Sequence, residues 1–326
     1  MIKEIKHLHK LSKIYRYYKS GKTVCDYTPL RIWLEPTDKC NLACPVCINK
    51  DMPEKTKGII QWQLFHKIID QLAGEICDIN LFHRGEPLLH PQITDMVTYC
   101  RGKGLNTRMH SNATMLTETL AESLIRNGLN YISFSFDGFD KETYEKNRVN
   151  GNFEITLRNI TNFLKIKKSL NSDTFVVLQI IDHGIKKLHE EKTKFLSNFK
   201  DLPLNKVSIR TPHNWGGGIS TKGQERPKNP IACTFPWYGL TIFHDGKVVP
   251  CSQDYIGVID LGDAKKQTIS EIWNGKAMQD LRANFTKRLY NQYSPCAKCD
   301  RVWRKNIFGV PVEYIGTFLK EAKIRK

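Results

Sequence analysis

The sequence has no long hydrophobic run, since its longest apolar stretches, such as Phe175–Ile181, are only as long as a strand. A bilayer span needs about 20 apolar residues, so we expect no transmembrane segment. The first residues are charged and show no small-residue cleavage site, so we expect no secretory signal and a cytoplasmic protein. With 40% hydrophobic and 25% charged residues among 326, the chain is neither disordered nor collagen-like.

Acidic residues are scarce relative to basic ones, with 33 Asp and Glu against 50 Lys and Arg, which gives a net charge of +17. This balance favours an anionic partner: nucleic acid, a membrane surface or a phosphorylated substrate. The basic residues are scattered, however, which favours a solvated basic surface instead. Residues 1–28 form a basic amphipathic extension, because Ile5, Leu8 and Leu11 recur at helical spacing. Peripheral membrane contact by this extension is one hypothesis, and packing on its own domain is favoured.

Short strand-like and helical segments alternate between residues 29 and 215. The predicted strands are Arg31–Glu35, Asp78–Phe82, Asn106–Met109, Tyr131–Phe136, Thr174–Ile181 and Lys206–Ile209. The predicted helices are Gln61–Leu72, Pro91–Gly102, Thr117–Asn127, Phe153–Leu170 and Lys187–Phe199. Six strands alternating with helices predict an α/β fold with parallel strands, of which a partial (β/α)6 TIM-like barrel is the simplest closed form. Chemistry is then expected at the C-terminal ends of the strands.

The alternation stops after a predicted linker at residues 216–232. Gly239–Phe243 and Lys247–Pro250 flank His244-Asp-Gly246 and predict a β-hairpin, and Ile269–Arg282 predicts one helix capped by Thr268 or Ser270. Residues 233–310 are therefore interpreted as a small hairpin-plus-helix domain, and 311–326 as a basic tail.

Ten cysteines without an export signal favour metal or redox chemistry over disulfides. Cys40, Cys44 and Cys47 lie within eight residues, directly after the first predicted strand. A structural zinc site wants four ligands, whereas three close thiols suit a [4Fe–4S] cluster with one open iron. Zinc remains an alternative at this point.

The C-x3-C-x2-C spacing after an opening strand resembles the radical S-adenosylmethionine (SAM) superfamily. The resemblance implies that the three thiolates hold a [4Fe–4S] cluster whose open iron chelates SAM. It also implies that reductive cleavage of SAM gives a 5′-deoxyadenosyl radical, which abstracts hydrogen from a substrate.

Further motifs match this family in the expected order. His83-Arg84-Gly85-Glu86 resembles the motif whose carboxylate holds the SAM amino group, although Arg84 stands where a glycine is usual. A cation beside Glu86 would keep that carboxylate ionised. The other SAM contacts that the resemblance implies are Ser111, Asn112, Ser135, Asp137, Arg148 and Gln179.

A second group, Cys233, Cys251, Cys296 and Cys299, lies in the small domain. Four thiols make a closed site, which suits zinc or an iron–sulfur cluster equally well. With Pro236-Trp237, Asp245-Gly246 and Ile272-Trp273, the group resembles the SPASM/twitch extension of radical SAM enzymes. No cysteine follows Cys299, so the resemblance is to the shorter twitch form, as in 2-deoxy-scyllo-inosamine dehydrogenase. It implies a second, auxiliary [4Fe–4S] cluster ligated by all four cysteines.

The leading hypothesis is radical SAM oxidation of a secondary alcohol of a carbohydrate or cyclitol, with the auxiliary cluster accepting an electron. The alternatives are sugar epimerisation or dehydration, peptide modification as in sulfatase-maturing enzymes, and a non-catalytic metal protein that binds nucleic acid. Glu86 and Arg148 speak against the last, since a pure binder would not need them in this order.

Arg210, at the end of the sixth predicted strand, is the candidate catalytic residue, either assisting deprotonation or holding an anionic group. His213, Asn214 and Trp215 follow it and are further candidates for substrate contact. We expect a small carbohydrate-like or anionic substrate and a reducing partner such as flavodoxin or ferredoxin.

Overall fold

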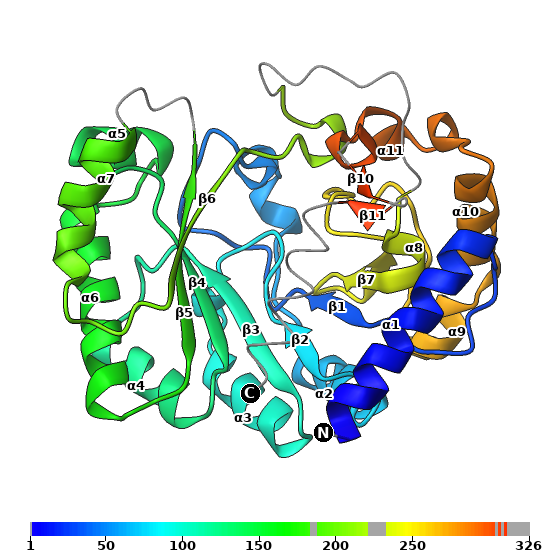
Figure 1. The fold of residues 1–326 in the computed structure, drawn as a ribbon, viewed down its shortest axis with the longest axis horizontal. Coiled ribbons are helices and arrows are strands. Elements are labelled where there is room, and N and C mark those ends of the chain that lie inside the picture. Colours follow the sequence, from blue (N-terminus) through cyan, green and yellow to red (C-terminus); the bar gives the residue numbers. More distant parts are fainter. Residues whose placement is uncertain (1, 183–187, 221–232, 304–305, 308–309, 312–326) are drawn as a thin grey trace. The chain divides into compact units, whose positions relative to one another are not determined.

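The computed structural model describes residues 2–182, 188–220, 233–303, 306–307 and 310–311, which form two compact units (Figure 1). The larger unit comprises Trp33–Pro212 and Ile242–Gly246. The smaller unit takes in the described parts of Met1–Ile32, His213–Thr241 and Lys247–Lys326. Among the described helices, none has both the length and the apolar character that a membrane crossing requires.

The larger unit is built on the six predicted strands, all of which are confirmed. Their order in the sheet is β6-β5-β4-β3-β2-β1, and the pairs from β2 to β6 are parallel. Their bounds are β1 Arg31–Leu34, β2 Asp78–Asn80, β3 Asn106–Ser111, β4 Tyr131–Ser135, β5 Phe175–Ile181 and β6 Lys206–Arg210. This is the partial α/β barrel that the alternation predicts.

The five predicted helices are also confirmed, and a short helix precedes Arg148. They are α2 Trp62–Leu72, α3 Ile93–Gly102, α4 Glu118–Arg126, α5 Lys141–Asn147, α6 Phe153–Ser169 and α7 Leu188–Leu196. Side-chain caps begin three of them: Thr117 accepts from the backbone N–H of Leu120, Asp140 from Thr143 and Asn152 from Ile155. These caps explain why α4, α5 and α6 begin where they do.

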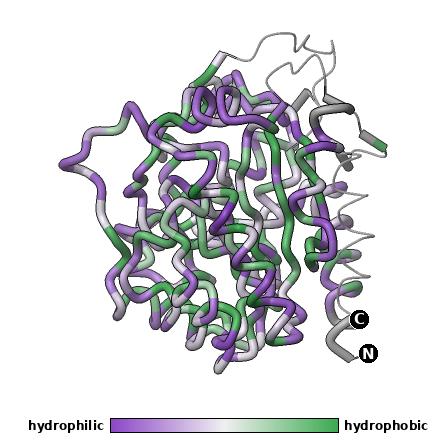
Figure 2. The backbone as a smooth tube through the Cα atoms, turned by 90° about the vertical axis from the view of Figure 1, so that its left-hand side faces the viewer, coloured by the Kyte–Doolittle hydropathy of each residue, from purple (hydrophilic) through white to green (hydrophobic). Residues whose placement is uncertain are grey.

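The strands present two different faces. Phe134 of β4 meets Phe163 of α6 edge to face at 5.2 Å, and Figure 1 shows α4 and α6 on the same side of the strands. The alternate residues of each strand point to the other side, which we call the inner face. The strand register places on it Arg108, His110, Tyr131, Ser133, Ser135, Phe175, Gln179, Ser208 and Arg210. Figure 2 shows hydrophobic and hydrophilic residues alternating over short distances along the backbone, as expected where each element buries one side.

The smaller unit contains the predicted hairpin strands, β7 Gly239–Ile242 and β8 Lys247–Val249, and a further strand β9 Gly262–Asp263 that pairs antiparallel with β8. The last residue of β7 and the turn that follows it, Ile242–Gly246, group with the larger unit. The remaining elements are α1 Ile2–Ser20, α8 Phe235–Tyr238, α9 Ile269–Trp273, α10 Lys276–Thr286, α11 Ser294–Lys298, β10 Asn306–Ile307 and β11 Val310–Pro311.

The prediction of one continuous helix over Ile269–Arg282 is wrong. Thr268 caps α9 in a capping box with Glu271, as predicted, but the helix breaks at Asn274 and Gly275 before α10 begins. The Asn274 side chain accepts from the backbone N–H of Cys25 and donates to its carbonyl, both at 2.8 Å. Asparagine and glycine are poor helix formers, and this long-range pairing holds the break.

Trp237 and Trp273 form the core of the smaller unit, as predicted, with 1% of each side chain's surface exposed. The N-terminal extension packs on them, since Tyr18 meets Trp237 at 5.5 Å and Tyr27 meets Trp273 at 6.4 Å. The predicted linker lies mostly outside the described residues, and so does the basic tail except for its first residue.

Candidate functional site

The loop after β1 carries the first cysteine group into the larger unit. A turn closes it, in which the backbone N–H of Cys47 donates to the carbonyl of Cys44 at 3.0 Å. Burial, together with the nearby Glu86, Cys47 and Cys44, raises the pKa of the Cys40 thiol to about 12. Thiols that raise one another's pKa in this way ionise to thiolates only when a cationic, sulfur-binding group is present. This set of donors therefore fits an iron–sulfur cluster.

Glu86 lies beside this loop and is buried, with 2% of its surface exposed. Its Oε1 accepts from Ser111 Oγ at 2.9 Å and from the Leu88 N–H at 3.1 Å, and its Oε2 accepts from the Asn112 N–H at 2.6 Å. Burial raises the pKa of Glu86 to about 6, although these hydrogen bonds lower it. The structure therefore joins Glu86 to Ser111 and Asn112, which lie 25 and 26 residues later in the chain, and Asn112 Nδ2 is 4.0 Å from Cys40 Sγ.

Gly85 explains why the loop and the Glu86 segment fit together. A Cβ at this position would clash with the backbone of Thr37, Asp38 and Lys39, which leads into Cys40. The Glu86 N–H donates to the Lys39 carbonyl at 2.9 Å in the same contact. Only a residue without a side chain allows this approach.

Replacing Gly85 with alanine is expected to destabilise the fold by about 1–3 kcal/mol, because backbone must move to make room. Urea unfolding monitored by circular dichroism measures this. The matched control is Gly102→Ala: like Gly85, Gly102 has no positive φ, but a Cβ there would meet nothing within 4 Å. Equal stability of the Gly85 variant and wild type would contradict the clash.

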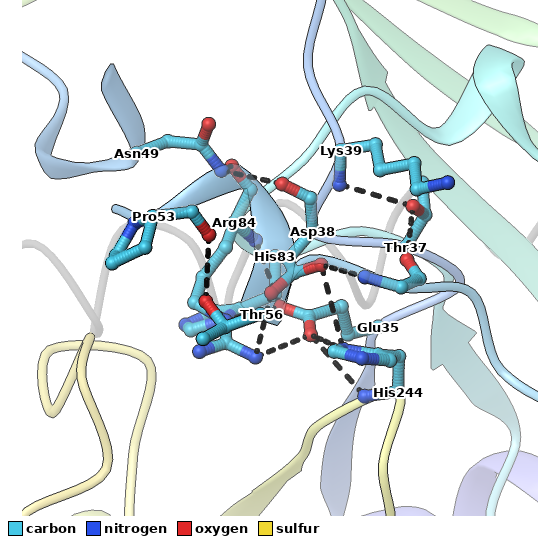
Figure 3. Close-up of polar contacts among 11 residues, drawn as sticks. Glu35, Thr37, Asp38, Lys39, Asn49, Pro53, Thr56, His83, Arg84 and His244 are labelled. Atoms are coloured by element: carbon cyan, nitrogen blue, oxygen red, sulfur yellow. Dashed lines mark hydrogen bonds and ion pairs between the residues drawn. The ribbon is translucent and has the colours of Figure 1, made fainter. Parts of the chain in front are cut away.

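The expectation that a cation stands beside Glu86 is wrong for Arg84, whose guanidinium pairs with another carboxylate. Arg84 Nε donates to Glu35 Oε2 and its Nη2 to Oε1, both at 2.7 Å (Figure 3). Glu35 has 0% exposed surface and also accepts from His244, whose Nδ1 lies 3.1 Å from Oε1. Burial alone would raise the pKa of Glu35, but the bonds from Arg84, His244 and His83 hold it well below its usual value.

Glu35, His83, Arg84 and His244 thus form an ion-pair network that was not predicted from the sequence. Two features of the sequence could have indicated the network: Glu35 directly follows an apolar strand, and Arg84 departs from the family motif. Glu35, Asp38 and His244 place ligand-type atoms within 4.8 Å of one another. Because Arg84 already binds both oxygens of Glu35, we interpret the group as an ion-pair network rather than a metal site.

The network makes stability depend on pH through His244. Burial lowers the pKa of its imidazole, but the hydrogen bond to Glu35 and the charges of Glu35 and Asp38 raise it above 6.5 overall. The contact with Glu35 therefore contributes its full stability below pH 6.5, and this contribution is lost as the pH rises through the raised pKa.

We therefore expect the free energy of unfolding of wild type to fall as the pH rises from 6.5 through the raised pKa of His244. In His244→Asn it should fall less. Urea titrations at several pH values measure it. His9→Asn, at an exposed position on α1, is the control and should follow wild type. Identical pH profiles for wild type and His244→Asn would contradict the assignment.

Arg148 and Asp137 form a second buried ion pair, with 2.6 Å between Nη2 and Oδ2. Arg148 Nη1 also lies 3.7 Å from Cys44 Sγ, and Asp137 Oδ1 accepts from the Ile181 N–H at 2.7 Å. The structure thus brings two predicted SAM contacts to the cysteine loop, although their charges are directed at each other.

The other predicted site residues lie on the inner face. Ser135 pairs in register with Gln179, and Gln179 with Ser208. Arg210 is exposed at the end of β6 and donates from Nε to Ser208 Oγ at 3.2 Å. On the same face, the ring of His110 stacks on that of Phe82, with 4.0 Å between the centroids. Burial, together with the charges of Arg108 and Arg210, lowers the pKa of His110 to about 3.

The second cysteine group comes together in the smaller unit. Cys233, Cys251, Cys296 and Cys299 line one cavity with Phe235, Pro250 and Phe285. Burial raises the pKa of Cys296, and the charges of Cys251, Cys233 and Cys299 raise it further. Four converging thiols in an apolar surround fit a fully ligated metal cluster.

His213, Asn214 and Trp215, expected near the substrate, group with this smaller unit. His213 lies 3.3 Å from Asp300, Asn214 donates to the Lys298 carbonyl at 2.6 Å, and Trp215 meets Tyr255 edge to face at 5.0 Å. The loop after β6 thus packs next to Cys299 within that unit.

Comparison with known proteins agrees with both cysteine groups. The model of the radical SAM superfamily matches residues 34–191, and that of the SPASM iron–sulfur cluster-binding domain matches residues 233–300. Fe-coproporphyrin III synthase of Methanosarcina barkeri is 30% identical over 42% of this chain, a segment that spans only 34% of that protein. PqqA peptide cyclase of Granulibacter bethesdensis is 20% identical over 84% of this chain and 80% of that protein.

Among solved structures, BtrN in complex with AdoMet and 2-DOIA has the same fold, with a TM-score of 0.59 at 17% identity over 89% of this chain and 97% of that one. The family uses SAM and [4Fe–4S] clusters as cofactors. The chain therefore belongs to the radical SAM superfamily, with a radical SAM domain followed by an SPASM-type iron–sulfur domain.

Proposed function

We propose that this radical SAM enzyme oxidises a secondary alcohol of a carbohydrate or cyclitol to a ketone. The observation that carries the proposal is the cavity with four cysteines, because a closed site has no position for substrate and is suited to electron transfer. The fold shared with BtrN, which was crystallised with AdoMet and 2-DOIA, supports the same class of reaction.

The residues have the following proposed roles. Cys40, Cys44 and Cys47 hold the SAM-binding cluster, and Cys233, Cys251, Cys296 and Cys299 hold the auxiliary one. Gly85 allows Glu86 to approach the cluster loop, and Glu86 binds the SAM amino group; Ser111, Asn112, Ser135, Asp137, Arg148 and Gln179 bind the rest of SAM. When bound, these cofactors supply hydrogen-atom abstraction at carbon and accept the remaining electron, and the hydroxyl proton leaves to a base. A flavodoxin or ferredoxin is the proposed electron donor.

The inner face suits a polar, hydroxylated substrate. Ser133 and Ser208 place hydroxyl groups on this face, and the buried Ser133 hydroxyl has no hydrogen-bond partner among the described residues. Arg108 and Arg210 add positive charge, so an anionic group on the substrate would be favoured. Because its pKa is lowered, His110 is neutral here and can accept a hydrogen bond.

The experiment is to incubate reconstituted enzyme, reductant and SAM with candidate sugars and cyclitols under anaerobic conditions. The expected product has lost two hydrogens, with one 5′-deoxyadenosine formed for each ketone. A product of unchanged mass would indicate an epimerase and refute oxidation.

Peptide modification is the second candidate, because PqqA peptide cyclase aligns with 84% of this chain. The same assay with a short peptide substrate distinguishes the two. A crosslinked peptide formed without any sugar product would favour this candidate.

Replacing Arg210 with alanine is expected to lower kcat/KM for the substrate about 10- to 100-fold, the effect of losing a charged hydrogen bond. SAM affinity should not change. Arg158→Ala, at an exposed position on α6, is the matched control and should behave as wild type. Unchanged kcat/KM in Arg210→Ala would remove it from the site.

A further inference from the structure

Arg84 occupies a position that should hinder SAM binding. It lies two residues before Glu86, where the family motif has a glycine, and a guanidinium there could pair with Glu86. Such pairing would compete with any cation that Glu86 binds. In the structure, however, Glu86 accepts hydrogen bonds from Ser111, Leu88 and Asn112.

The guanidinium of Arg84 is instead held by Glu35. Two parallel bonds of 2.7 Å join them, and Glu35 Oε2 also accepts from the Arg84 backbone N–H at 3.2 Å (Figure 3). The ring of Phe243 covers the guanidinium at 3.7 Å. Bidentate geometry with a stacked aromatic ring fixes the direction of the Arg84 side chain.

Glu35 is itself fixed from two further sides. His244 approaches Oε1 and His83 approaches Oε2 at 3.3 Å, so both carboxylate oxygens are oriented. Asn49 donates to the Asp38 carbonyl at 2.6 Å and to the Arg84 carbonyl at 3.0 Å, which ties the Arg84 backbone to the cysteine loop. The network therefore determines where both the charge and the backbone of Arg84 lie.

We propose that Glu35 sequesters the charge of Arg84, so that the neighbouring Glu86 stays available for the cationic amino group of SAM. Glu35 is a positioning residue, and the inference rests on the proposed role of Glu86. This chain thus has an arginine in a motif that usually has glycine, and a carboxylate directly after β1 compensates for its charge.

The test measures the Kd of SAM by calorimetry in anaerobically reconstituted protein. Glu35→Gln is expected to weaken SAM binding at least about tenfold, because the released guanidinium competes for Glu86. Adding Arg84→Gly to Glu35→Gln is expected to restore the Kd to within about threefold of wild type. A second probe, 5′-methylthioadenosine, lacks the amino group, so its Kd should not change in Glu35→Gln.

Several results would overturn the inference. These are wild-type SAM affinity in Glu35→Gln, a loss that Arg84→Gly does not restore, or an equal loss for 5′-methylthioadenosine. If Glu35→Gln does not fold, Arg84→Gly alone decides: SAM affinity within about threefold of wild type supports the inference, and a loss of about tenfold or more refutes it. Glu86→Gln tests the proposed function separately, since unchanged SAM affinity there would refute the role of Glu86 itself.

Discussion

Replacing Cys47 with alanine is expected to lower the rate of 5′-deoxyadenosine formation roughly a thousandfold or more, which corresponds to at least about 4 kcal/mol in the barrier. Cys47 belongs to the group of three thiols in the loop after β1, and a cluster held by three cysteines has no spare ligand. The variant should also lose about four of about eight iron atoms per chain.

The measurement combines iron and sulfide analysis with chromatography of 5′-deoxyadenosine. Cys100→Ala is a matched control, because Cys100 is a fully buried thiol on α3 outside both groups. It should keep its iron content, although the loss of the contacts made by its buried sulfur lowers its stability. Full SAM cleavage by Cys47→Ala would contradict the assignment of the first group.

Replacing Cys251 with alanine is expected to separate SAM cleavage from substrate oxidation. Cys251 lines the cavity with Cys233, Cys296 and Cys299, in the smaller unit. Without the auxiliary cluster, the substrate radical has no acceptor for its electron, so ketone formation should fall at least about a hundredfold, a barrier change of about 3 kcal/mol.

5′-Deoxyadenosine should still form in this variant, within about a factor of ten of wild type. The two products are measured in the same reaction by mass spectrometry. Undiminished ketone formation by Cys251→Ala would remove the auxiliary cluster from the reaction. Loss of both products would indicate that the second cysteine group is needed for SAM cleavage itself.

Much of the fold could be predicted from the sequence because local signals agreed with it. The strands read as apolar runs such as that of β5, and caps such as Thr117 and Asn152 begin the helices between them. The break between α9 and α10 could not be predicted in the same way. It depends on the pairing of Asn274 with Cys25, two residues 249 positions apart in the chain.

The candidate site likewise has a part that the sequence predicts and a part that depends on long-range contacts. Cysteine spacing identified both groups, because ligand sets leave a dense pattern in the sequence. The partner of Arg84 was missed, since proximity in sequence suggests Glu86 while packing selects Glu35, 49 residues away. Likewise, the position of Arg148 against Asp137 and Cys44 follows from the meeting of three separate connections. Tertiary contacts decide which carboxylate an arginine pairs with, and the sequence pattern does not contain those contacts.

The most direct test of the central claim is to add SAM to the anaerobically reconstituted, chemically reduced protein and measure 5′-deoxyadenosine. We predict that wild type forms it, that Glu86→Gln forms much less, and that Cys47→Ala forms it roughly a thousandfold or more slowly than wild type. Protein that contains about eight iron atoms per chain and still forms no 5′-deoxyadenosine would contradict the account.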